Sequence, residues 1–284
     1  MATSPGSVDG DSVRQSMKQM NALAMALCDE DRYLEAEALL LQALRVGEAR
    51  LGEQDLDVAR VRRSLGNVYR SERRFSDGKA NYLRALDANK AGAAPDHIEV
   101  AAIYRDLAEL HRLQGDCVEA ETYARKALEI TASMSGTAHH DTAADSVTLA
   151  VLLVRQARYD EAERLLRQAL TTFDTVRSVD SYQAAVAAHE LGVLLAEHGQ
   201  ADEAAAFYQR SVAIKRHVLG PGHPEIATTL HNWALLAKST GQIEQARRLW
   251  AEAEATLNAR DATSTDENRR TQDMNEAREG AGDD

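Results

Sequence analysis

The stretch Tyr159-Asp160-Glu161-Ala162-Glu163-Arg164-Leu165-Leu166-Arg167-Gln168-Ala169-Leu170 contains the pattern that decides the fold. Its small residue, Ala162, has an equivalent every 42 residues along the chain, without insertion or deletion. The residues of this slot are Ala36, Gly78, Ala120, Ala162, Ala204 and Ala246. A constant period of about 20 to 50 residues is typical of a stacked-repeat protein. Because such an array has a long surface and no central cavity, it favours binding over catalysis.

Apolar residues follow the small slot at the three- and four-residue steps of one helix face. Four residues after it stand Leu40, Tyr82, Ala124, Leu166, Tyr208 and Trp250. Three residues further on stand Ala43, Ala85, Ala127, Ala169, Ser211 and Ala253. This pattern predicts a helix in each repeat, which we call helix B.

A second periodic run lies upstream of each helix B and predicts a helix A. Its central slot holds Leu23, Leu65, Leu107, Leu149, Leu191 and Trp233, and a small residue follows each one: Ala24, Gly66, Ala108, Ala150, Gly192 and Ala234. Small residues that face large ones let two helices pack closely. The turn slot between the two helices holds Asp31, Arg73, Gly115, Ala157, Gly199 and Gly241. Glycine there suits the left-handed conformation that ends a helix.

The repeated order of Leu-Ala or Leu-Gly, a turn, an aromatic residue, Glu-Ala-Glu and Ala-Leu resembles the tetratricopeptide repeat. The segment Leu219-Gly220-Pro221-Gly222-His223-Pro224-Glu225-Ile226-Ala227 is similar to the 42-residue repeats of kinesin light chains. The resemblance implies an all-α fold, a right-handed superhelical α-solenoid of six helix-turn-helix repeats over residues 12–258. We expect residues 1–11 to form a disordered N-terminus. We expect residues 259–284 to form an acidic, mostly disordered tail.

Polar residues recur just before helix A, at Asp55, His97, His139, Ser181 and His223. Because successive repeats hold them on separate layers, we interpret them as residues that begin a helix rather than as metal ligands. The cluster His139-His140-Asp141 falls at one of these helix starts. Neither a phosphate-binding glycine loop nor a Gly-x-Ser-x-Gly motif is present. The sequence therefore predicts neither an enzyme nor a cofactor or metal site.

The composition indicates a soluble intracellular protein. The formal net charge of −12 argues against non-specific binding to nucleic acid or to an anionic membrane. The two cysteines, Cys28 and Cys117, occupy different slots, which fits free thiols in a reducing compartment. No apolar run is long enough to cross a membrane. We therefore expect a cytoplasmic location.

The resemblance implies that helix A lines the concave side of the solenoid, where a partner would bind. The slots that face this side form two zones. Repeats 2 and 3 give a basic zone of Arg60, Arg63, Asn67, Arg70, Arg105 and Arg112. Repeats 4 and 5 give an apolar zone of Val147, Val151, Val154, Val186 and Val193. His189 and His231 share the slot of Arg63. Asn232 alone matches the asparagine with which this family tends to hold a peptide backbone.

Arginine side chains match carboxylates, and an apolar strip buries apolar side chains. The two zones therefore predict a protein-interaction scaffold that binds an acidic, partly apolar peptide or helix in the concave groove. Another interpretation is that the arginines pair with acidic residues of helix B and that the next repeat covers the valines. A regulatory sensor whose groove binds a signalling peptide or a small ligand is the alternative function. A self-assembling structural array is a third.

Overall fold

A computed structural model of the chain describes residues 5–91, 96–176 and 181–258. Every regular element within these ranges is an α-helix, and the helices pack pairwise in sequence order, as the periodicity predicts. Within the same ranges, none of the helices has the length and apolar character that crossing a membrane requires. The predicted tail, residues 259–284, lies outside the described residues.

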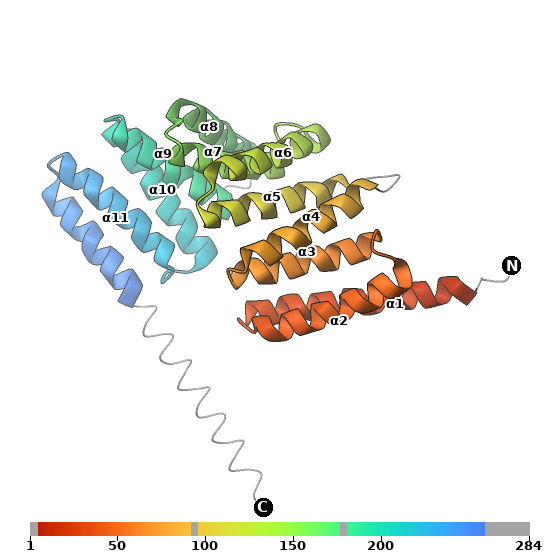
Figure 1. Ribbon diagram of the computed structural model, residues 1–284. Helices are drawn as coiled ribbons and strands as arrows, with labels where there is room; N and C mark the ends of the chain where they lie inside the picture. The colour runs from red at the N-terminus through yellow and green to blue at the C-terminus, as the bar shows by residue number, and fades with distance from the viewer. Residues whose placement is uncertain (1–4, 92–95, 177–180, 259–284) are drawn as a thin grey trace, which may run out of the picture. The chain divides into compact units, whose positions relative to one another are not determined.

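The chain divides into two compact units, each with three helix-turn-helix repeats. Unit 1, Met1–Thr137, contains α1 (Pro5–Asp29), α2 (Tyr33–Leu51), α3 (Leu56–Ser71), α4 (Phe75–Ala91), α5 (His97–Gln114) and α6 (Cys117–Ser135). Unit 2, Ala138–Asp284, contains α7 (His140–Arg155), α8 (Tyr159–Thr175), α9 (Tyr182–Glu197), α10 (Ala201–Leu219), α11 (Pro224–Ser239) and a last helical segment, 243–258. Odd-numbered helices are helix A of a repeat. Figure 1 shows the paired helices side by side within each repeat.

The first helix begins earlier than the sequence suggested. Residues 1–11 were expected to be disordered, but α1 begins at Pro5, and residues 1–4 lie outside the described ranges. Proline is favoured at the first position of a helix, because its fixed φ suits the helix and its missing N–H has no intrahelical partner there.

Each turn between helix A and helix B has the same left-handed geometry. The turn slot has a positive φ in all six repeats: Asp31, Arg73, Gly115, Ala157, Gly199 and Gly241. The following residue donates its N–H to a carbonyl five residues back, as from Gln200 to Leu195 at 2.8 Å and from Gln242 to Ala237 at 2.8 Å. These bonds satisfy carbonyls that the helix end leaves unpaired. The prediction for this slot is confirmed.

The polar slot before helix A caps the helix. Side chains of Asp55, His139, Ser181 and His223 accept N–H groups from the first turn of the helix that follows. His97 differs, because it is the first residue of α5 and Asp96 accepts the N–H of Glu99 instead. Aspartate is a strongly preferred capping residue, which explains the shift by one position.

The small slot of helix A determines how closely helix B approaches. A Cβ atom added at Gly66 would lie 2.6 Å from the Tyr82 ring, and one added at Gly192 would lie 2.7 Å from the Tyr208 ring. The other four repeats have alanine in the small slot, as Ala150 in the fourth repeat, where Leu166 replaces the tyrosine. The close approach of the two helices at Gly66 and Gly192 thus depends on the absence of a Cβ beside the tyrosine ring.

Candidate functional site

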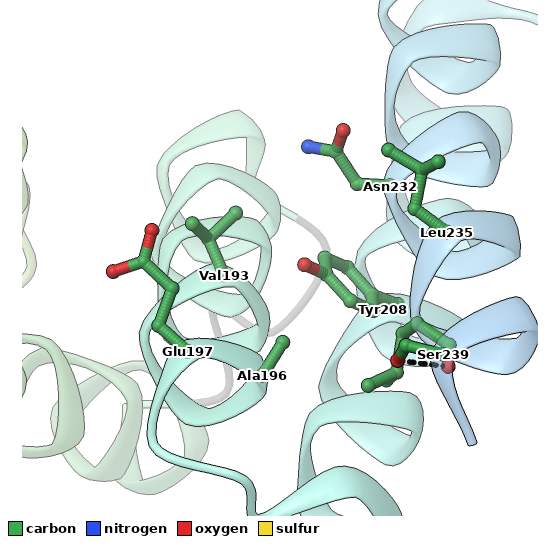
Figure 2. Close-up of a pocket in the computed structure, with 8 residues that line it drawn as sticks. Val193, Ala196, Glu197, Tyr208, Asn232, Leu235 and Ser239 are labelled. Atoms are coloured by element: carbon green, nitrogen blue, oxygen red, sulfur yellow. Dashed lines mark hydrogen bonds between the residues drawn. The ribbon is translucent and has the colours of Figure 1, made fainter.

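An open groove lies between α9 and α11 of unit 2, with α10 forming its floor. Its volume is about 350 Å³. The groove is lined by Val193, Ala196, Glu197, Tyr208, Asn232, Leu235, Leu236 and Ser239. Figure 2 shows the α9 and α11 side chains on opposite sides, with the Tyr208 hydroxyl directed into the space between them. The walls are mainly apolar, while Asn232, Tyr208 and Glu197 supply polar groups.

A hydrogen-bonded network holds the amide of Asn232. The Nδ2 group of Asn232 lies 3.4 Å from His189 Nε2, and His189 Nδ1 lies 3.1 Å from Thr229 Oγ1. Lys215 Nζ donates to Thr229 Oγ1 at 3.1 Å, and the Thr229 hydroxyl donates to the carbonyl of Glu225 at 3.0 Å. Burial and, secondarily, the charge of Lys215 lower the pKa of His189 to about 4. A neutral His189 can therefore accept from Asn232, whose Oδ1 is left available to a ligand.

Tyr208 places a hydroxyl at the floor of the groove. The residue is 2% exposed, and none of the residues that the structure describes hydrogen-bonds its hydroxyl. Its counterpart in unit 1 is Tyr82, three repeats earlier. The Tyr82 hydroxyl donates to Asn67 Oδ1 at 2.6 Å. Val193 occupies the slot of Asn67, so the same partner is missing in unit 2.

Most of the predicted basic zone lies in ion pairs within unit 1. Arg60 contacts Asp57 and Asp96 at 2.8 and 3.3 Å. Arg63 contacts Asp106 at 2.5 Å and Glu99 at 3.4 Å; Arg70 reaches Asp106 at 3.4 Å, and Arg112 reaches Glu109 at 2.6 Å. Arg105 is half-buried. Pairing was the other interpretation of these arginines, but the acidic partners lie on or next to helix A, not on helix B. They offset the positive charge on which a preference for acidic partners depends.

The predicted apolar zone divides between core and groove. Val147 is 0% exposed and belongs to the core, so the expected contact of its side chain with a partner is wrong. Val151, Val154 and Val186 are half-buried but do not line the groove. Val193 does line it.

The histidines and the asparagine also separate. Asn232 lines the groove, and His189 holds it from behind. His231 points instead into a second hollow of unit 2, between α11 and the helical segment 243–258, where its ring lies 6.5 Å from that of Trp250. The structure therefore brings together three of the predicted residues, Val193, His189 and Asn232.

The tetratricopeptide repeat family matches residues 16–91, 63–133, 99–175 and 182–259, which is most of the chain. The chain belongs to the tetratricopeptide repeat family. A comparison with the curated proteins finds no match.

Solved structures with tetratricopeptide-like repeats are similar to this chain in fold. BtubC (BKLC) from P. vanneervenii is 21% identical, with a TM-score of 0.62, over 91% of this chain and 93% of that one. A putative kinesin light chain from Podospora anserina with nearly identical repeats is 20% identical, with a TM-score of 0.58, over 72% of this chain and 96% of its own. PilF of Pseudomonas aeruginosa is 15% identical, with a TM-score of 0.63, over 88% and 94%. The predicted tetratricopeptide repeat is confirmed, and kinesin light chain-like proteins are among the solved structures that share its fold.

Tetratricopeptide repeats generally act as protein-interaction scaffolds and are typically non-enzymatic. Within the described ranges, no group of three or more His, Cys, Asp or Glu side chains is arranged to hold a metal. The binding residues predicted from the sequence did not include Tyr208 or Leu235, which both line the groove. Leu235 shares the slot of Val193, so the slot pattern alone would have selected it. Tyr208 belongs to helix B, and a search confined to helix A could not reach it.

Proposed function

We propose that this tetratricopeptide repeat protein is an interaction scaffold that binds an extended peptide segment of a partner protein in the groove between α9 and α11. The observation that carries the proposal is the pair of polar groups that line the groove between apolar walls, the Asn232 amide oxygen and the Tyr208 hydroxyl. A peptide backbone offers alternating donors and acceptors, and these two groups can supply both complements.

The apolar walls give the groove a place for one or two side chains of the peptide. Leu235 is 47% exposed on α11 and lines the groove on the side opposite Val193 of α9. Peptide recognition commonly combines backbone hydrogen bonds for affinity with apolar pockets for specificity. The groove has the size of a site for one short peptide segment rather than for a whole folded partner.

The arginines of unit 1 gave the expectation that the protein prefers an acidic partner, but their ion pairs give this expectation little support. An acidic ligand would have to exchange with Asp106, Glu99 or Glu109 for the same guanidinium groups. Such an exchange gains little free energy, because one carboxylate replaces another. We therefore retain the scaffold function and its apolar component, and assign the recognition to unit 2.

The test is selection of ligands from a random decapeptide library by the whole chain, followed by measured dissociation constants. We expect Asn232→Ala and Leu235→Asp each to weaken the selected peptides by about tenfold or more, because one loses a backbone hydrogen bond and the other places a charge in an apolar wall. Val218→Asp is the matched control, since Val218 is 40% exposed on α10 and lines no part of the groove.

Two outcomes would contradict the proposal. One is the absence of any selected peptide; the other is binding that both groove substitutions leave unchanged. Thermal stability measured with a metabolite library separates the sensor alternative, because a ligand that binds the folded state raises the unfolding temperature. A shift with a small metabolite, without peptide binding, would favour the sensor.

A further inference from the structure

Two carboxylates on the inner face of α9 have no ion-pair partner among the described residues. They are Glu190 and Glu197, which lie seven residues apart and share one helix face with Val193. Glu197 and Val193 line the groove, and Figure 2 shows both on the α9 side. A negative charge therefore borders the apolar wall.

Unit 1 explains why Glu190 lacks a cation. Asp106 occupies the same slot two repeats earlier, and it is held by Arg63 and Arg70, which lie 43 and 36 residues before it. The residues at the same distances before Glu190 are Val147 and Val154. In the apolar zone, valines thus replace the two arginines that pair with the equivalent carboxylate, Asp106, in unit 1.

The nearby cations do not replace them. Arg155 and Lys215 act on Glu190 electrostatically, but neither lies within ion-pair distance of it. Lys215 is buried and pairs with Glu225 at 3.2 Å. Burial raises the pKa of Glu190 by more than Arg155 and Lys215 lower it, so these two cations only partly offset the cost of its buried charge.

Tyr208 supplies an independent sign of a ligand at the same place. Its side chain is buried, and its hydroxyl reaches the groove without a described partner. Burial, followed by the charges of Glu190 and Glu197, raises its pKa. Both carboxylates therefore lie near the hydroxyl that a peptide would meet.

We propose that the groove of unit 2 selects a peptide that carries a lysine or arginine next to an apolar residue, and that Glu190 and Glu197 receive the cation. This inference rests on the proposed peptide-binding function and names its specificity. The apolar residue packs against Val193 and Leu235, and the basic side chain extends along α9. The net charge of −12 attracts cationic segments and speeds their association.

The experiment compares matched peptides on the whole chain. Decapeptides with a central leucine and randomised flanking residues are selected by the wild-type protein and by the double variant Glu190→Gln and Glu197→Gln. We expect lysine and arginine to be enriched beside the leucine with the wild type only. For the best peptide, Lys→Glu should weaken binding by about tenfold or more, and the double variant should reduce this ratio to about twofold.

Three further variants make the comparison specific. Glu254→Gln is the matched control, because this carboxylate belongs to unit 2 but lines the separate hollow near Trp250. Glu197→Gln alone changes an exposed residue, so it keeps the test valid if the double variant fails to fold. Arg155→Ala should strengthen binding of the lysine peptide about two- to threefold, since it removes a competing cation.

The possible outcomes distinguish failure of this inference from failure of the proposed peptide-binding function. Peptides that bind the wild type equally well with lysine or glutamate, or an acidic preference, would overturn the inference but leave peptide binding intact. If no peptide is selected, the proposed function fails and the inference fails with it. A ratio that Glu254→Gln changes as much as the double variant does would also overturn the assignment to Glu190 and Glu197.

Discussion

Three of the six turns place a residue with a side chain in the left-handed conformation that favours glycine: Asp31, Arg73 and Ala157. Ala157 has a φ of 58°, whereas glycine fills the same left-handed slot at Gly115, Gly199 and Gly241. A Cβ atom in this region costs roughly 1–2 kcal/mol, which is partly offset by the larger unfolded-state entropy of glycine. We expect Ala157→Gly to raise the free energy of unfolding by about 0.5–1 kcal/mol, measured by urea denaturation.

The reverse change tests the same explanation. Gly199→Ala places a Cβ in the left-handed region at a φ of 75° with no atom within 4 Å of it, so a loss of stability there reflects the backbone alone. A stabilising Gly199→Ala, or an Ala157→Gly that lowers stability, would contradict the strain. Asp31 is a poorer test position because its carboxylate accepts a hydrogen bond from Tyr33 at 2.8 Å.

His189 makes the stability of unit 2 depend on pH. Its pKa is about 4 in the folded protein, against an ordinary value of about 6.5 in an unfolded chain. The unfolded state therefore binds the proton first, and the free energy of unfolding falls as the pH drops from about 6.5 towards 4, by up to about 3 kcal/mol. Above pH 6.5 the contribution is constant.

The variant His189→Gln isolates this effect, because glutamine can accept from Asn232 and does not titrate. We expect the difference in unfolding free energy between wild type and variant to shrink steadily across that window, as followed by urea denaturation at several pH values. Glu225, whose lowered pKa causes a separate loss in more acidic solution, is common to both proteins and cancels. A difference that does not change with pH would contradict a buried neutral His189.

At the scale of the helices, the pairing of α9 with α10 depends on the match between Gly192 and Tyr208. A Cβ at Gly192 would lie 2.7 Å from the Tyr208 ring, which is closer than packed atoms approach. We expect Gly192→Ala to lower the free energy of unfolding by about 1–3 kcal/mol, because overpacking outweighs the helix propensity that alanine adds. Urea denaturation measures it.

The double variant Gly192→Ala with Tyr208→Leu provides the control, since Ala150 and Leu166 already form this pair in the fourth repeat. It should recover at least half of the lost stability. An additive loss in the double variant would show that the close approach is not the cause. We expect the double variant to bind the selected peptides more weakly than the wild type, because it lacks the Tyr208 hydroxyl at the floor of the groove.

The helices could be predicted because the same pattern of apolar and small residues recurs every 42 residues. The left-handed turn at Ala157 and the capping role of His139 followed from slots shared by several repeats. The burial of Val147 did not follow, because it depends on which side chains of the folded protein cover that slot. The groove itself needs Tyr208 from helix B, which no pattern within helix A contains.

The ion pairs of Arg63 were not predicted, because its partners lie on the next helix A and not on helix B. Arg63 reaches Asp106 across 43 residues and Glu99 across 36 residues, about one repeat plus one or minus six positions. Consecutive copies of helix A therefore pair with each other, while the sequence interpretation looked for partners on helix B. A search for opposite charges at these two spacings would have found Arg60 with Asp96 as well.

At the scale of the whole molecule, the two units use the same framework in opposite ways. In unit 1 the helix-A slots hold arginines and carboxylates that pair with one another, as Arg63 and Asp106 do. In unit 2 the equivalent slots hold valines, and Glu190 has no ion-pair partner in the part of the chain that the structure describes. This difference places the proposed peptide site and the paired arginines in different units.

This difference between the two units predicts that Arg63 stabilises the fold of unit 1 and does not bind a ligand. Arg63 is 29% exposed and pairs with Asp106 and Glu99. Arg63→Ala removes the cation of Glu99 and leaves Asp106 with Arg70 alone, at 3.4 Å. We expect a loss of about 1–3 kcal/mol in unfolding free energy, with faster amide hydrogen exchange in α3 and α5. Arg247→Ala should cost less than about 0.5 kcal/mol, because its pair with Glu244 is about 70% exposed on both sides. If Arg63 instead served to bind an acidic partner, Arg63→Ala would leave the free energy of unfolding unchanged and abolish binding of acidic peptides. Those two results together would place the peptide-binding site in unit 1.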